Sequence, residues 1–450
     1  MSVNDSNAND AAGHGQKPSE STDPSIMIRL AILMFFQFFM WGAWYVSATG
    51  FMLREDISMN GLVFALYSVG PLAAIFSPFF LGLIADRFMP TQFTLAMLFA
   101  VGGLLLFVAP SMASPFGVPD VSSQHWLMGR FSMLWQSLQH PFVLTMLGHM
   151  LCFMPTIALT ASLSFKHLKN PEKEFPVVRV LGTIGWICGN LAISLLPGKD
   201  ASSLQFFLAG TCAIGLGIYC LMLPHTPPPM KGKRVSFGEI LGLDALRLFR
   251  SPSYTVFIIA SFLTCIPLAG YFAFARSYVE ASNVTPFGSA TFAMAFGQMS
   301  EIFFMLVMPL CFARLGVKWM LAIGMGAWVL RYGLFAAAAG DQIWWMIIGG
   351  ILLHGICYDF FFVTGMIYVD KKTPAAIRNQ AQGFLVLVTQ GLGMFIGAQV
   401  FGGLEVFQTE GGVLDWKGFW MYPAGFAAVV MVGFILLFWD KKPKADIEVG

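Results

Sequence analysis

The sequence predicts an all-α, polytopic membrane protein with twelve transmembrane helices in two six-helix bundles. Composition is the first observation: 57% of the 450 residues are hydrophobic and 11% are charged, whereas a soluble domain carries roughly 25% charged residues. The second is that apolar stretches of spanning length, about 20 residues, recur along the chain with short polar breaks between them. The third is a polar, basic loop near the middle, which divides these stretches into six and six. A soluble enzyme is therefore excluded.

The twelve spans follow one another with few long interruptions. We expect them, in chain order, near 26–50, 61–85, 91–110, 141–165, 177–196, 204–224, 253–279, 287–313, 317–339, 343–369, 377–402 and 416–439. Residues 1–25 are polar and lack the pattern of a signal peptide, so they are expected to form a disordered cytoplasmic tail. The expected organisation is therefore a tail at 1–25, a first bundle at 26–224, a central loop at 225–252, a second bundle at 253–440 and a tail at 441–450.

Lysine and arginine positions predict the orientation, since positively charged loops stay in the cytoplasm. With the N-terminus inside, the outer segments hold only Arg54, Arg130, Lys199 and Lys417, and nearly all other loop cations lie in inner segments. Both termini and the basic central loop are therefore expected in the cytoplasm. Two six-helix bundles joined by such a loop are typical of transporters whose halves move around a site at the membrane midplane.

One polar stretch between the third and fourth spans carries apolar side chains at helical spacing: Leu127, Phe131, Leu134, Trp135 and Leu138. Tryptophan suits a membrane interface. We expect a short amphipathic helix on the outer surface, which either covers the end of a bundle or takes part in gating.

Only two of the 24 acidic residues, Glu301 and Asp359, lie deep in an expected span. An ionisable residue there costs at least about 2.5 kcal/mol, so each needs a partner or a water-filled cavity. Gln298 lies on the same helix face as Glu301, and His354 and Tyr358 lie within about a turn or two of Asp359. An amide beside a carboxylate suits a neutral solute with many hydroxyl groups, because the pair can both accept and donate hydrogen bonds.

The fifth span carries a second polar stripe. Arg179, Thr183 and Trp186 are four and three residues apart, which places them on one helix face. Together they can pair a carboxylate, bind a sugar hydroxyl and stack on a ring. Two structural alternatives stay open: Arg179 as a cation at the helix entrance, and Trp186 as a packing side chain. Arg331 in the ninth span suits a structural partner for a buried acid, and His354 is either a switch that titrates near neutral pH or a core histidine.

Other patterns indicate structure rather than chemistry. Gly391, Gly393 and Gly397 lie within an apolar span without the preceding strand of a nucleotide loop, so we interpret them as helix packing. Thr389 and Gln390 beside them are expected to hydrogen-bond between helices. The seven cysteines show no metal-ligand spacing, and no ATP-binding motif is present. No cofactor or metal is expected, transport must use an ion gradient or the gradient of the solute, and the net charge of +2 does not suggest a nucleic-acid partner.

Several motifs resemble known transporters. The stretch that begins at Gly82 reads Gly-Leu-Ile-Ala-Asp-Arg and resembles the Gly-x-x-x-Asp-Arg signature of major facilitator transporters. Seven further stretches are similar to the bacterial nucleoside:proton symporter family of that superfamily: Gln37-Phe-Phe-Met-Trp-Gly-Ala-Trp, Phe153-Met-Pro-Thr, Arg179-Val-Leu-Gly-Thr-Ile-Gly-Trp, Leu241-Gly-Leu-Asp-Ala-Leu, Gln298-Met-Ser-Glu, Trp328-Val-Leu-Arg-Tyr and Tyr358-Asp-Phe-Phe. The similarity runs from about Arg29 to Trp439.

This resemblance implies uptake of nucleosides across the bacterial inner membrane by alternating access, driven by inward proton flow. The expected partners are the nucleoside, protons and the lipid bilayer, and the chain is expected to act as a monomer. The positions that match the substrate-contacting residues of the family are Arg179, Thr183, Trp186, Gln298, Glu301, His354 and Tyr358. For proton coupling we expect Asp359 or Glu301 to carry the proton, with Arg179 and Arg331 as alternating partners.

The chain departs from the family in two places. Within the seventh span, the stretch from Pro267 to Phe272 has no amide where family members carry amide side chains. In the tenth span, His354 stands where family members carry a tyrosine. The cavity is therefore expected to take a different subset of nucleosides or a related glycosylated or polyol solute. The alternative function is a facilitator, or a proton symporter for a sugar or other polyhydroxylated solute, on the same scaffold.

Overall fold

The computed structural model describes residues 21–439 except 53, 55, 60–61, 81–87, 118–131, 133, 195–201, 229–242, 285–289 and 412. Five of the features expected from the sequence lie wholly or largely outside these residues. They are the two tails, the Gly-x-x-x-Asp-Arg stretch, the start of the expected surface helix and most of the basic central loop. In the described end of that surface helix, Leu134 is buried and Trp135 is 69% exposed.

The first half of the chain is helical throughout its described part. Its helices are α1 (Pro24–Tyr45), α2 (Ala48–Met52), α3 (Val63–Phe80), α4 (Thr91–Val108), the short η3 (Ala109–Met112), α6 (Pro141–His167), α7 (Pro171–Ser194) and α8 (Leu204–Cys220). Proline lies in the first turn of α1 and α6, where its missing N–H costs nothing. Helix α7 starts before the expected residue 177, because Glu172 and Glu174 lower the hydropathy of its first turn while favouring a helix N-terminus.

The second half is also helical, but three of its long helices are interrupted. Its elements are η6 (Leu243–Arg250), α10 (Pro252–Ala281), α11 (Ala290–Ala338), α12 (Trp344–Leu352), α13 (His354–Tyr358), the π-helical η8 (Asp359–Val363), α14 (Thr364–Lys372), η9 (Ala375–Ile377), α15 (Arg378–Val386), the π-helical η10 (Leu387–Gly393), α16 (Met394–Gln408), β1 (Thr409–Glu410), β2 (Val413–Leu414) and α17 (Trp416–Leu437). The two strands form an antiparallel hairpin.

Helix α11 contains two of the expected spans. Gly316 has φ +66° inside this 49-residue element, a conformation that glycine adopts without strain, and the chain turns there without a loop. Nine helices in the described part are long and apolar enough to cross a membrane, one of them is α11, and α3 and α8 contain shorter apolar helices. With the two parts of α11 separated, these make twelve apolar helical segments, of which those in α3 and α8 are shorter than a full span.

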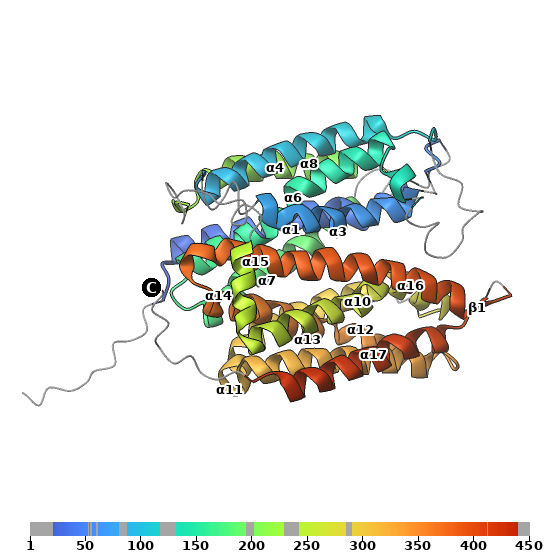
Figure 1. Cartoon of the computed structure of the whole chain (residues 1–450). Coiled ribbons are helices and arrows are strands. Elements are labelled where there is room, and N and C mark those ends of the chain that lie inside the picture. The colour runs from blue at the N-terminus through green and yellow to red at the C-terminus, as the bar shows by residue number, and fades with distance from the viewer. Residues whose placement is uncertain are drawn as a thin grey trace, which may run out of the picture.

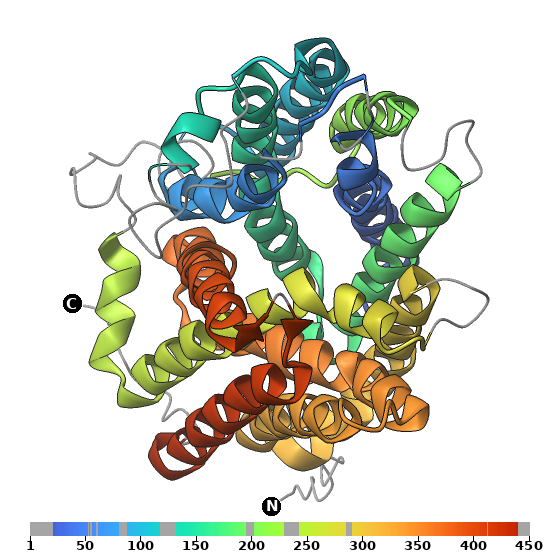
Figure 2. The same ribbon diagram turned by 90° about the vertical axis from the view of Figure 1, so that its right-hand side faces the viewer.

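The helices run roughly parallel or antiparallel to one long axis (Figure 1). We call the end at which α1 begins and α17 ends the termini end, at the left of Figure 1, and the opposite end, which carries β1, the hairpin end. Viewed along the axis, the helices of the first half gather on one side and those of the second half on the other (Figure 2). Contacts between α7 and α11, α3 and η10, and α6 and α15 join the two groups.

Small residues let helices approach closely within each group. Gly393 and Gly397 pack against α10, and a Cβ on Gly393 would lie 2.7 Å from the Cβ of Cys265 and 3.0 Å from the carbonyl oxygen of Phe262. The glycines of this span therefore serve helix packing, as the sequence predicts.

We expect Gly393→Val to lower the stability of the folded protein by about 1–3 kcal/mol, because the added side chain overlaps α10. Gly433→Val on α17 is the matched control, since nothing lies within 4 Å of the position that its Cβ would take. Thermal unfolding in detergent micelles measures the difference. Equal melting temperatures for the two variants would contradict the close packing of these helices.

Candidate functional site

Glu301 joins the two halves of the chain near the middle of the helices. Its Oε2 accepts a hydrogen bond of 3.0 Å from the hydroxyl of Thr183 on α7, and its Oε1 lies 2.9 Å from Nε2 of His354 on α13. Glu301 is only 7% exposed and His354 4%. A buried carboxylate needs such partners, and one of these two comes from the opposite half.

Behind His354 lies a column of stacked groups. The ring of Tyr271 stacks on the His354 imidazole with centroids 5.3 Å apart, and the guanidinium of Arg331 lies 4.1 Å from the centroid of Tyr271. Nε of Arg331 donates to the carbonyl oxygen of Gly350 at 3.0 Å. Arg331 is fully buried, and its two Nη atoms have no hydrogen-bond partner in the described part of the chain.

These contacts distinguish the possible roles of Arg331. Arg331 contacts the carbonyl of Gly350 and the ring of Tyr271. Its charge interacts with that of Glu301 electrostatically, without a direct contact. The geometry therefore favours a structural cation within the second half over a substrate ligand.

Asp359 is the first residue of the π-helical segment η8. Its side chain is fully buried, and neither carboxylate oxygen has a hydrogen-bond partner among the described residues. The charges of Glu301 and Arg179 act on it. π-Helical turns are rare and frequent at functional sites, and an ionised carboxylate without a partner is costly in such a place.

Arg179 lies on the first-half side of the same region. Its guanidinium lies 4.1 Å from the centroid of the Phe38 ring, and its Nη1 has no hydrogen-bond partner among the described residues. The side chain is buried, so Arg179 is not merely a cation at the helix entrance. Gly182 leaves room for it, because a Cβ there would lie 2.7 Å from Nη1 of Arg179.

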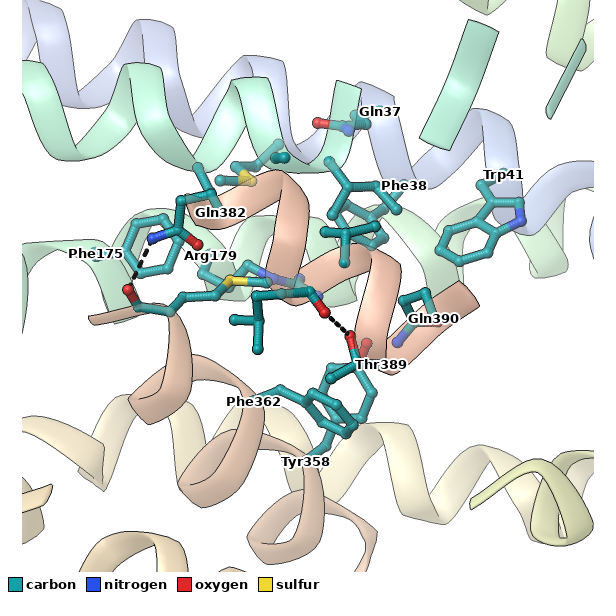
Figure 3. A pocket seen from close by; sticks show the side chains of 17 residues that line it. Gln37, Phe38, Trp41, Phe175, Arg179, Tyr358, Phe362, Gln382, Thr389 and Gln390 are labelled. Carbon is teal, nitrogen blue, oxygen red and sulfur yellow. Dashed lines mark hydrogen bonds between the residues drawn. The ribbon is translucent and has the colours of Figure 1, made fainter. Parts of the chain in front are cut away.

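A pocket lies between the halves, on the side of the Thr183–Glu301 contact that faces the termini end. It holds about 700 Å³ of empty space, a figure that includes the open solvent at its mouth. In Figure 3, residues of α1 lie on one wall, Tyr358 and Phe362 lie on the opposite wall, and α15 and η10 lie between them. Its polar and aromatic lining comprises Gln37, Phe38, Trp41, Phe175, Arg179, Tyr358, Phe362, Gln382, Thr389 and Gln390.

Trp186 lies farther toward the hairpin end, in an aromatic group. Its ring meets that of Trp41 edge to face at 5.2 Å and lies 6.0 Å from that of Tyr45. Trp186 is half-buried. The stripe predicted for the fifth span is therefore real, and it runs from the pocket at Arg179, past the Glu301 contact, to this aromatic group.

Five of the predicted site residues form two neighbouring sets. Thr183, Glu301 and His354 are in direct contact, whereas Arg179 and Tyr358 line the pocket. The charges of Arg179, Glu301 and Asp359 all act on Tyr358. Gln298, one turn from Glu301 on α11, is half-buried and makes no hydrogen bond within the described part of the chain.

Sequence reasoning missed part of the pocket. Gln37 lines it, and its Nε2 donates to the hydroxyl of Thr156 at 3.0 Å. Gln37 is the one amide in the apolar first span, and that rarity is a signal that could have marked it. The expectation for Thr389 was wrong: its hydroxyl donates to Leu385 of the same helix at 2.7 Å, because a threonine can bond the carbonyl one turn earlier, and with Gln390 it lines the pocket.

A family model described as nucleoside H+ symporter matches residues 25–122 and 125–443 of this chain. The putative nucleoside transporter YegT of Escherichia coli K12 is 36% identical over 425 residues, which cover 91% of this chain and 93% of that protein. The xanthosine permease of the same organism is 30% identical over 92% of this chain and 96% of that protein.

Solved structures agree with these relatives. The crystal structure of the nucleoside transporter NupG matches with a TM-score of 0.65 and 28% identity, over 92% of this chain and 100% of that chain. The proton:xylose symporter XylE, of the major facilitator superfamily, matches with a TM-score of 0.64 at 12% identity, over 92% of this chain and 96% of that one. The second likeness shows the fold alone, which is the major facilitator fold.

We expect Arg331→Lys to destabilise the protein by about 2 kcal/mol, because lysine loses the planar stack on Tyr271 and the bond from Nε to Gly350. Arg276→Lys is the matched control, since Arg276 is exposed and pairs with Glu280 on the helix surface at 3.3 Å. Its effect should stay below about 0.5 kcal/mol. Thermal unfolding in micelles compares the two variants, and a loss at Arg331 no larger than that at Arg276 would contradict a structural role.

Proposed function

The chain belongs to the nucleoside H+ symporter family, and we propose that it imports nucleosides together with protons by alternating access. The observation that carries this proposal is the buried Thr183–Glu301–His354 contact, which crosses between the halves beside a pocket lined by both. A carboxylate whose hydrogen-bond partners change as the halves separate can couple binding of the solute to binding of a proton.

We assign nucleoside recognition to both halves. Gln298 and Glu301 can accept hydrogen bonds from ribose hydroxyl groups, and Thr183 and Arg179 can donate to oxygen atoms of the solute. The exposed ring area of Trp186 and Tyr358 can stack on a nucleobase. The unpartnered Nη1 of Arg179 supports this assignment, since a solute can supply the missing acceptor.

The imidazole of His354 affects which nucleosides the protein recognises. Its Nε2 is occupied by Glu301, and its buried Nδ1 has no partner among the described residues. The ring can therefore serve as an additional donor or acceptor in a cavity where α10, from Pro267 to Phe272, supplies no amide. This supports recognition of a base by imidazole rather than by amides of the seventh span.

We assign the coupling proton to Asp359, with Glu301 as the second carboxylate. Asp359 has no hydrogen-bond partner among the described residues, so either a proton or a cation must compensate its charge in the apolar interior. Arg179 is the cation from the opposite half whose charge acts on it. When the halves move one way, Asp359 releases its proton and its charge is compensated by the guanidinium of Arg179. When they move back, Asp359 leaves Arg179 and takes up a proton. Arg331 stays within the second half and stabilises the charge of Glu301 through the Tyr271–His354 column.

We place the protein in the bacterial inner membrane with the termini end in the cytoplasm. The described cations at that end support this orientation, among them Lys166, Lys169, Lys371, Lys372 and Arg378, because positively charged loops stay in the cytoplasm. We also propose that a single chain transports, because the pocket is formed by the two halves of one chain.

Asp359→Asn should abolish accumulation of a nucleoside driven by an inward proton gradient, while exchange of labelled for unlabelled nucleoside remains measurable. An amide cannot take up and release the coupling proton, but it leaves the path open. Glu301→Gln should reduce accumulation and binding together, because it changes a solute contact as well.

Asp341→Asn is the matched control for this test, since Asp341 is an exposed acid outside the site. Uptake is measured in proteoliposomes with the external pH lowered. If Asp359→Asn and Glu301→Gln each still concentrate the solute as Asp341→Asn does, the assignment of the proton is wrong.

Competition decides between a nucleoside symporter and the alternative, a carrier of sugars or other polyhydroxylated solutes. We expect purine or pyrimidine ribonucleosides to inhibit uptake of a labelled nucleoside in proteoliposomes with an inward proton gradient, and free ribose and xylose to have no effect at equal concentration. Inhibition by free sugars alone would favour the sugar carrier. Entry that never exceeds equilibrium under the gradient would favour a facilitator.

A further inference from the structure

A second pocket lies at the termini end, away from the candidate transport site. The end of α6 contributes Ser162 and Lys166, the segment after α8 contributes Thr226, and η9 and α15 contribute Ala375 and Arg378. It holds about 470 Å³ of empty space, including its open mouth. Lys166 and Thr226 belong to the first half and Arg378 to the second, so the pocket spans the boundary between them.

The charged lining of this second pocket is positive. Lys166 and Arg378 are its two charged lining residues in the described part of the chain, and their charges act on each other. Lys166 donates from Nζ to the carbonyl oxygen of Pro227 at 3.1 Å. Nε of Arg378 lies 2.7 Å from Oδ1 of Asp370. One carboxylate therefore offsets two cations that repel each other across the boundary.

Several donors in the second pocket remain available. The two Nη groups of Arg378 make no hydrogen bond within the described residues. The hydroxyls of Thr91 and Ser162 also make none there, although both side chains are buried. Thr91 is in addition the first residue of α4, and helix N-termini favour negative charge.

These donors match one kind of ligand. A guanidinium presents two parallel N–H groups, which suit the oxygens of a phosphate, and a lysine adds a point charge. Two hydroxyls on the same pocket wall can donate to the remaining oxygens. A phosphate group would also remove the repulsion between Lys166 and Arg378.

We propose that the second pocket binds a phosphate group between Lys166 and Arg378 and thereby holds the end of α6 against the start of α15. The group comes either from the headgroup of an anionic phospholipid at the membrane surface or from free phosphate in solution. This site is independent of which solute the protein transports, because it shares no lining residue with the transport pocket.

The first arm of the test measures the melting temperature of the full chain in neutral detergent with inorganic phosphate, against chloride at equal ionic strength. The second arm compares nanodiscs of phosphatidylglycerol with nanodiscs of phosphatidylcholine. Stabilisation in the first arm identifies free phosphate as a ligand, and stabilisation in the second alone identifies the lipid headgroup.

Variants connect either response to the two cations. Lys166→Gln and Arg378→Gln should each weaken the effect, with a loss of affinity of about tenfold, whereas Lys166→Arg should retain it. Arg314→Gln is the matched control, since it removes a positive charge from an exposed residue at the same end. Each variant is compared with itself with and without ligand, so a change in its own stability does not affect the result.

Hydrogen exchange tests the bridge between the halves. Bound ligand should slow exchange both near residues 162–168 and near residues 375–382. Three results overturn the proposal: no response in either arm, equal responses of wild type, Lys166→Gln and Arg378→Gln, and slowed exchange on one half alone.

Discussion

The cost of placing charge in an apolar interior is the constraint on which the middle of this molecule depends. Three buried ionisable groups meet that cost with different partners. Among the described residues, Glu301 has a hydroxyl and an imidazole as partners, Arg331 has a carbonyl and an aromatic ring, and Arg179 has an aromatic ring alone. Asp359 has no hydrogen-bond partner in the described part of the chain. The least compensated carboxylate is therefore the one most sensitive to any change in its surroundings.

Helix α7 makes contacts of different kinds with its own half and with the other half. On α7, Gly185 and Gly189 pack directly against the backbone of α1, so the two helices are held by close contact. Toward the other half, the same helix offers the hydroxyl of Thr183 to Glu301. A hydrogen bond to a charged group contributes about 1.5–3 kcal/mol and can be exchanged for another, whereas tight backbone packing has no second arrangement of equal quality. Helix α7 is therefore fixed to α1 more firmly than to the second half.

Much of this arrangement follows from the sequence, for identifiable reasons. Spans and buried charges are predictable because hydropathy and the rarity of midspan acids are local properties of the chain, and Glu301 and Asp359 stand out on that basis. The Tyr271 stack, the π-helical turn at Asp359 and the place of Gln37 in the pocket were not predicted. Each depends on which residues of distant helices meet, and helical periodicity alone does not contain that information.

The unequal compensation of Arg179 and Asp359 suggests why solute and proton can be coupled at all. The two charges act on each other across the boundary between halves, yet the structure gives them no direct ion pair. If Arg179 stayed paired with Asp359, the guanidinium would stabilise the charged carboxylate and oppose its protonation. Because Arg179 instead rests on Phe38, a solute that engages the guanidinium alters the field at Asp359. In the proposed mechanism, binding of the solute therefore changes the affinity of Asp359 for the proton, and by linkage the proton changes the affinity for the solute by the same factor.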